Sequence, residues 1–123
     1  MSKSPKALMK EWRDRLGLQD WQIKFEPKCP PEEMELDDAA GCTSWAEAIK
    51  CAKVQILDPK YYEEDNIIPF DFEKTLVHEL LHLKLSLVSS GVDDFQERAM
   101  HQIIDDLARA LVDTKREAEA KNG

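Results

Sequence analysis

The sequence has few of the features that mark a secreted, membrane-bound or nucleic-acid-binding protein. No apolar run approaches the roughly 18–20 residues that span a bilayer, and no apolar stretch of signal-peptide length follows the N-terminus. The net charge is −8 and no basic cluster offsets it, which disfavours binding to nucleic acid or to anionic membranes. We therefore expect a cytoplasmic protein with no nucleic-acid and no membrane partner.

Cysteine is also scarce. Cys29, Cys42 and Cys51 are odd in number, and no two of them have CxxC spacing. Neither a disulfide framework nor a thiolate zinc site is indicated. We expect reduced thiols in or near the core.

Repeats, linkers and changes of composition along the chain are absent as well. A chain of 123 residues is one domain by the usual size relation, and it buries one modest core with one cleft. We predict a single domain over 1–123, with a charged C-terminal tail, 115–123, that frays.

What the sequence does contain is a clear order of elements. Ser4 and Pro5 are typical of a helix start, and short alternating apolar patterns later in the chain are typical of strands. The predicted elements are a helix over about 5–16, strands over about 21–27, 41–46 and 52–56, and helices over about 70–88 and 94–115. This order predicts an α+β fold with a small three-stranded, mostly antiparallel sheet.

The run His78-Glu79-Leu80-Leu81-His82 lies inside the first of the two long helices. Residues four apart in a helix point the same way, so His78 and His82 can hold one zinc ion together. Glu79 lies beside this pair, in the general-base position of an HEXXH motif. Two unpartnered histidines on so apolar a helix would be costly, which favours metal binding over chance.

A zinc site needs a third protein ligand, and the last helix offers Glu97 and His101. Both are about equally far along the axis from the point opposite His82. Glu97 continues an apolar line of that helix, where a lone carboxylate is unfavourable unless it is paired or bound. We favour Glu97 as third ligand, and His101 is the alternative, or a residue that hydrogen-bonds a ligand or lies at the rim of the site. The segment Asp94-Phe95-Gln96-Glu97 also resembles a capping box, in which Glu97 would only bind the backbone.

The motif, followed by Glu97 on the next helix, resembles the gluzincin arrangement of zinc peptidases. The small size and the order of elements are similar to the minigluzincins and to related single-domain HEXXH proteins, many of them carried by bacteriophages and prophages. The resemblance covers about residues 8–112. It implies a zincin-like minimal domain with zinc bound by His78, His82 and Glu97, and Glu79 as general base. It also implies a peptide or protein substrate that lies extended along a sheet edge.

Two departures from this family are visible. Thermolysin-like gluzincins carry an aspartate four residues after the glutamate ligand, where this chain has His101. No firm counterpart of their oxyanion-stabilising histidine or tyrosine is present. Tyr61 and Tyr62 precede the motif helix and are the candidates, although two loop tyrosines are also typical packing residues.

The sequence thus predicts a zinc-dependent hydrolase, a metallopeptidase in which zinc lowers the pKa of a water molecule to about 7 and Glu79 accepts its proton. The alternative is a latent or non-catalytic metal-stabilised binding or assembly module on the same fold. The short chain favours this alternative, since it leaves little room for a deep cleft. Substrate identity and oligomeric state are not encoded in these patterns.

Overall fold

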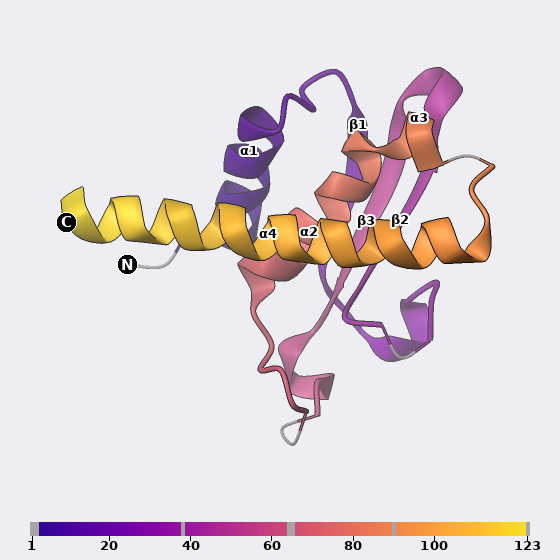
Figure 1. The fold of residues 1–123 in the computed structure, drawn as a ribbon. Helices are drawn as coiled ribbons and strands as arrows, with labels where there is room; N and C mark the ends of the chain where they lie inside the picture. The colour runs from indigo at the N-terminus through magenta and orange to yellow at the C-terminus, as the bar shows by residue number, and fades with distance from the viewer. Residues whose placement is uncertain (1–2, 38, 64–65, 90, 123) are drawn as a thin grey trace.

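A computed structural model describes residues 3–37, 39–63, 66–89 and 91–122 of the chain. The predicted α+β class is confirmed (Figure 1). The elements are α1 (Pro5–Arg15), β1 (Gln22–Cys29), β2 (Gly41–Ala46), β3 (Cys51–Leu57), α2 (Phe72–Lys84), α3 (Ser86–Ser89) and α4 (Asp94–Asn122), with single 3-10 turns at Pro31–Glu33, Glu47–Ile49 and Pro59–Tyr61. Among these residues, no helix combines the length and the apolar character that crossing a bilayer requires.

The three strands form a mixed sheet in the order β1-β3-β2. β2 and β3 pair antiparallel, as expected of a hairpin, whereas β1 pairs parallel to β3. The expectation of a mostly antiparallel sheet is therefore wrong. Val54 and Ile56 of β3 are fully buried, which suits a central strand with β1 on one side and β2 on the other. As a consequence, β2 is an edge strand.

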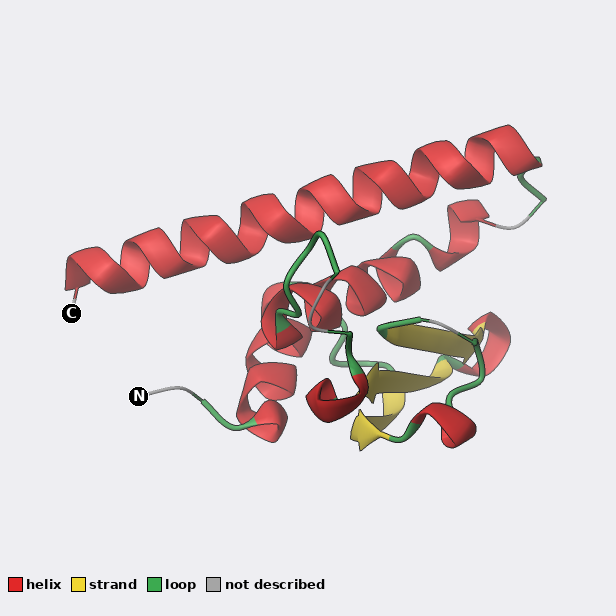
Figure 2. Ribbon diagram, turned by 90° about the horizontal axis from the view of Figure 1, so that it is seen from below, coloured by secondary structure: helices red, strands yellow, loops and turns green. Residues whose placement is uncertain are grey.

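The molecule is layered, with α2 between the sheet and α4 (Figure 2). The leucines and the valine of α2 pack against both the sheet and α4 and belong to one core. The core residues it contributes are Leu76, Val77, Leu80, Leu81 and Leu83. α4 packs against α2 through Ile104, Ala108 and Val112. The central helix is thereby fixed on two sides, and its remaining face is free to carry polar groups.

α2 begins where the sequence predicts. The Asp71 side chain accepts a hydrogen bond from the backbone N–H of Lys74 at 3.1 Å, an N-cap that satisfies one of the first free donors of the helix. The helix ends at Lys84, earlier than predicted, and α3 follows after a break at Leu85. The motif residues lie in the unbroken part.

The helix α4 continues to Asn122, beyond the end near residue 115 that the sequence predicts, while fraying of 115–123 stays a prediction. Lys115 is buried, and its ammonium group binds the Glu73 carboxylate of α2 and lies 3.2 Å from that of Glu11 of α1. Trp12 donates its indole N–H to Glu73 at 2.6 Å. Arg116 adds two hydrogen bonds to Asp71, at 2.8 and 3.0 Å. Separation of α4 from α1 and α2 at Lys115 would leave buried charges without partners, so this polar cluster holds the helix in place at that point.

Candidate metal centre

Three histidines from two helices converge on one point. His78 and His82 of α2 and His101 of α4 each offer a ring nitrogen, and these three atoms all lie within 4.8 Å of one another. The ring centroids are 5.1 Å apart for His78 and His82, and 4.8 Å apart for His82 and His101. His78 and His82 are half-buried and His101 is exposed. Three imidazoles at this spacing could hold a divalent transition metal.

The local sequence explains the convergence. His78 and His82 are one turn apart on α2, on the face that the apolar residues leave free. The stretch of α4 that packs on α2 begins near Met100, and His101 stands at the start of this stretch. The sequence placed Glu97 and His101 about equally far along the axis from the point opposite His82, and the observed position of His101 agrees with this estimate.

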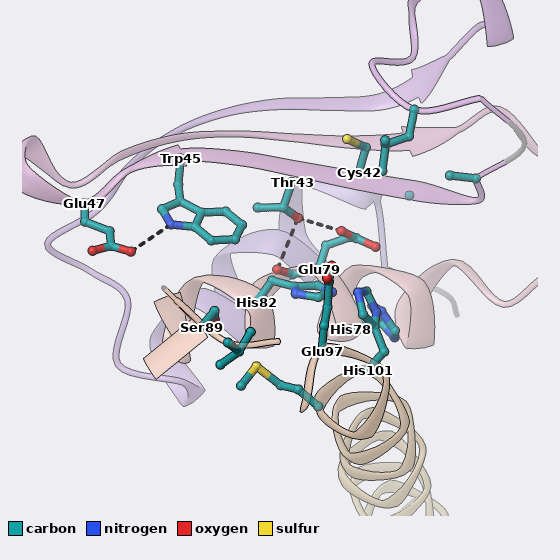
Figure 3. A pocket seen from close by; sticks show the side chains of 15 residues that line it. Cys42, Thr43, Trp45, Glu47, His78, Glu79, His82, Ser89, Glu97 and His101 are labelled. Atoms are coloured by element: carbon teal, nitrogen blue, oxygen red, sulfur yellow. Dashed lines mark hydrogen bonds between the residues drawn. The ribbon is translucent and has the colours of Figure 1, made fainter. Parts of the chain in front are cut away.

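Glu97 stands one turn before His101 and lines the same pocket, but it is not part of the group of three ligand atoms. Its side chain is exposed and extends toward the histidines in Figure 3. The role of Glu97 as third ligand stays a prediction, while His101 has the better position. The capping role foreseen for Glu97 belongs to Gln96, which exchanges hydrogen bonds of 2.8 and 3.1 Å with Asp93.

Glu79 points from α2 toward the sheet, and the sheet holds its carboxylate (Figure 3). The Thr43 hydroxyl of β2 donates a hydrogen bond to Oε1 of Glu79 at 2.7 Å and lies 3.2 Å from the backbone oxygen of the same residue. Gly41 makes room for Oε2, since a Cβ at residue 41 would approach this oxygen to 2.8 Å. A buried carboxylate thus lies between the motif helix and the edge strand, beside His78.

Burial sets the protonation of these groups. Burial raises the pKa of Glu79 to about 7, against the opposing effect of the Thr43 hydrogen bond. Burial lowers the pKa of His82 to about 4, assisted by the nearby His78 and His101. Burial also lowers the pKa of His78, although the neighbouring Asp105 acts in the other direction. At neutral pH the two α2 imidazoles are therefore uncharged and have a lone pair free for a metal.

Asp105 supports His78 from α4. Its Oδ1 lies 3.5 Å from Nδ1 of His78. A carboxylate at Nδ1 favours the tautomer that protonates this nitrogen and leaves Nε2 as the donor atom. Asp105 follows His101 by four residues, so both face α2 from the same side of α4. Four residues after Glu97 the chain has His101 and no aspartate. Counted from His101 instead, the position four residues later holds Asp105.

A cleft passes the histidines on both sides. A pocket of about 560 Å³ contains His82, His101 and the apolar side chain of Trp45, and a second of about 460 Å³ extends past Asp105. Both are lined by Gly41, His78 and Glu79, so they meet at the candidate site. β2 contributes to this cleft along most of its length, which puts an edge strand beside the histidines.

The two tyrosines have other surroundings. Tyr61 is exposed and lines a different hollow. Tyr62 lines the second pocket, but its hydroxyl donates to the backbone oxygen of Ile68 at 2.7 Å and its ring packs against that of Phe70 at an angle of 56°. A phenol has one proton to donate, so Tyr62 in this arrangement has none for an oxyanion. The oxyanion role stays a prediction.

Sequence reasoning did not find Gly41, Thr43 or Asp105. The spacing of Asp105 from His101 was a usable signal, because four residues on a helix mean one face. For Gly41 and Thr43 the sequence offers no signal, since their role depends on how β2 docks on α2.

The fold and the site together define a small α+β domain with a three-histidine cluster that could hold a metal ion. Comparison with known protein families, with curated protein sequences and with solved structures yields no match for this chain. The resemblance to gluzincins therefore depends on the motif and on the order of elements alone.

Proposed function

We propose that this protein is a zinc-dependent hydrolase that cleaves a peptide bond, with Glu79 as general base. The observation that carries the proposal is the convergence of three imidazoles beside a buried carboxylate, all facing one cleft. His78, His82 and His101 are the proposed ligands. A set of three protein nitrogens leaves one position open, as in catalytic zinc sites.

Zinc held there would supply Lewis acidity, which lowers the pKa of a water molecule and polarises a carbonyl group. Glu79 has its Oε1 held by Thr43, so Oε2 is the oxygen with free acceptor capacity. Oε2 of Glu79 accepts the proton of the attacking water and passes it to the nitrogen of the departing amine. Asp105 keeps His78 in the metal-binding tautomer.

The edge strand supports a peptide as substrate. Among the residues that the structure describes, β2 pairs with β3 alone, and we propose that its other side pairs with an extended chain by backbone hydrogen bonds. Gly41, Thr43 and Trp45 of β2 line the first pocket. A peptide aligned on β2 would bring a scissile bond past Glu79 and the histidines.

The test is a comparison of zinc content and hydrolysis in the wild type and in Glu79→Gln. The substitution keeps the shape of the side chain but removes the base. We expect one zinc per chain in both proteins, and cleavage of unfolded casein by the wild type that falls at least about a hundredfold in the variant. Full activity in Glu79→Gln would exclude this mechanism.

A second candidate is a metal-stabilised binding or assembly module on the same fold. The exposed apolar side chains of α4 favour it: Phe95, Ile103 and Leu107 are 72, 55 and 44 % exposed, and apolar side chains gathered on one surface are typical of docking faces. A module of this kind predicts that chelation unfolds the domain and that no variant cleaves casein. A catalytic site predicts that the fold survives chelation while activity is lost.

A further inference from the structure

We propose that Glu97 is a displaceable fourth protein ligand, which closes the metal site until a substrate enters the cleft. This inference rests on the proposed function, since it takes His78, His82 and His101 as the ligands that hold the ion. It concerns the position that those three leave open.

The position of Glu97 on α4 is the first argument. Glu97 and His101 are four residues apart in the first turns of the helix, so their side chains leave the same face one turn from each other. Both line the pocket that holds His78 and His82. In Figure 3 the Glu97 side chain extends from α4 toward the imidazoles.

The Glu97 carboxylate is also free to bind a metal. Among the residues that the structure describes, no hydrogen bond or ion pair engages it. The capping box of α4 is formed by Asp93 and Gln96. An unengaged carboxylate in the pocket of the three imidazoles can donate an oxygen to a divalent cation that they hold.

Glu97 is placed to bind the metal reversibly, unlike the three histidines. The three imidazole nitrogens already lie within 4.8 Å of one another, and the Glu97 oxygens are outside that group. An exposed glutamate reaches a nearby ion by rotation of its own side chain. Because the Glu97 side chain is exposed, a substrate carbonyl oxygen arriving along β2 can displace it.

The experiment compares the wild type, Glu97→Gln and the control Asp94→Asn, each loaded with one equivalent of cobalt(II). Asp94 is an exposed acid of the same helical turn that does not line the pocket, so its substitution matches the change in charge. Visible absorption is recorded from pH 6 to pH 9, because a coordinated water loses a proton near neutrality and alters the cobalt spectrum. Zinc affinity is measured by competition with a chromophoric chelator.

We expect a spectrum nearly independent of pH for the wild type and Asp94→Asn, and a clear transition for Glu97→Gln. The zinc dissociation constant should rise about tenfold in Glu97→Gln alone. A transition already present in the wild type, or identical spectra and affinities in all three proteins, would overturn the inference. So would loss of stoichiometric metal in Glu97→Gln with retention in His101→Ala, which would make Glu97 the third ligand.

Casein cleavage by the same proteins tests the proposed function separately. Hydrolysis that increases in Glu97→Gln supports both ideas. A pH-dependent wild-type spectrum together with hydrolysis refutes the closed site and leaves the enzyme intact. The expected spectra without hydrolysis in any variant support the fourth ligand and refute the enzymatic function.

Discussion

At the scale of single residues, the position of the Glu79 carboxylate depends on the absence of a side chain at Gly41 as much as on the hydroxyl of Thr43. The Gly41 backbone approaches so closely that a Cβ there would lie 2.8 Å from Oε2 and 2.9 Å from Cγ of Glu79, and 3.0 Å from Cγ2 of Thr75. All three distances are shorter than ordinary contacts, so a side chain at residue 41 would have to displace its neighbours.

Gly41→Ala should therefore destabilise the protein by about 1–3 kcal/mol, the usual cost of overpacking, and abolish hydrolysis by moving Glu79. Urea unfolding measures the first effect and casein cleavage the second. In a double-mutant cycle with Glu79→Ala, the cost of Gly41→Ala should shrink, because the truncated side chain no longer obstructs the new methyl group. Purely additive costs would show that Glu79 is not the group displaced.

Thr43→Val removes the hydroxyl that donates to Glu79 while nearly keeping its shape, and Thr43→Ser is the matched control. The hydrogen bond lowers the pKa of Glu79, so its loss should raise that pKa further above its value of about 7. NMR titration of the side-chain carboxyl group in zinc-free protein measures the change. An unchanged Glu79 pKa in Thr43→Val would mean that the hydroxyl is not a significant donor in solution.

The raised pKa of Glu79 also predicts how the stability of zinc-free protein changes with pH. A folded-state pKa above the unfolded value means that stability is greatest below the unfolded value, here 4.5, and is lost as pH rises through about 7. In Thr43→Val this loss should extend to higher pH. Above neutrality, where the charged carboxylate lacks its donor, the free energy of unfolding of Thr43→Val should be lower than that of the wild type by about 1–3 kcal/mol. The difference should be smaller at pH 5.

The same residues show what the sequence can and cannot predict at this scale. The pairing of His78 with His82 follows from helical periodicity alone, and the structure agrees. The third position depends on how α4 rotates against α2. The apolar line through Glu97 indicated burial there, but the first turns of α4 begin before the stretch that packs on α2, so Glu97 is exposed. Periodicity gives a face, and it does not give the point at which that face meets its neighbour.

At the scale of elements, the C-terminal half of α4 is fastened by charge as well as by apolar packing. The Lys115 side chain is only 4 % exposed, yet it carries a charge that Glu73 and Glu11 neutralise. Burial lowers the pKa of Lys115, but the hydrogen bonds with these two carboxylates outweigh burial and raise it. The ammonium group is therefore charged at neutral pH.

Lys115→Ala should destabilise the protein by about 3–5 kcal/mol, because Glu73 remains buried without its principal cation. Lys121→Ala, an exposed change in the same helix, should stay within about 0.5 kcal/mol. Chemical denaturation measures both. Equal, small effects would show that the lysine ion pairs contribute little to the docking of α4.

The sequence was informative about where most elements lie and less so about how they pair or end. Strand alternation and the Asp71 cap located β2, β3 and the start of α2. The parallel pairing of β1 with β3 was missed, since alternation shows which residues face the core and says nothing of strand direction. The length of α4 was underestimated, because a run of charged residues is typical of a frayed tail unless a partner such as Glu73 buries one of them.

At the scale of the whole molecule, a metal held by the three histidines would join α2 to α4. Zinc should then stabilise the fold by an amount set by its free concentration, about 2.7 kcal/mol at a hundred times the dissociation constant. Thermal unfolding at defined free zinc measures this gain. His101→Ala should lose most of it, whereas the exposed neighbour Gln102→Ala should keep it. A gain that survives in His101→Ala would place the ion elsewhere.

The helical periodicity of α4 has one further consequence. Glu97, His101 and Asp105 follow one another at one-turn intervals on one side of α4, so a slide of α4 by one pitch, about 5.4 Å, would offer a carboxylate where an imidazole now stands. The preference for nitrogen at this point is thus a matter of axial register. Lys115 lies some four turns further along α4 and is paired with carboxylates of α1 and α2. These ion pairs hold α4 at its present axial position.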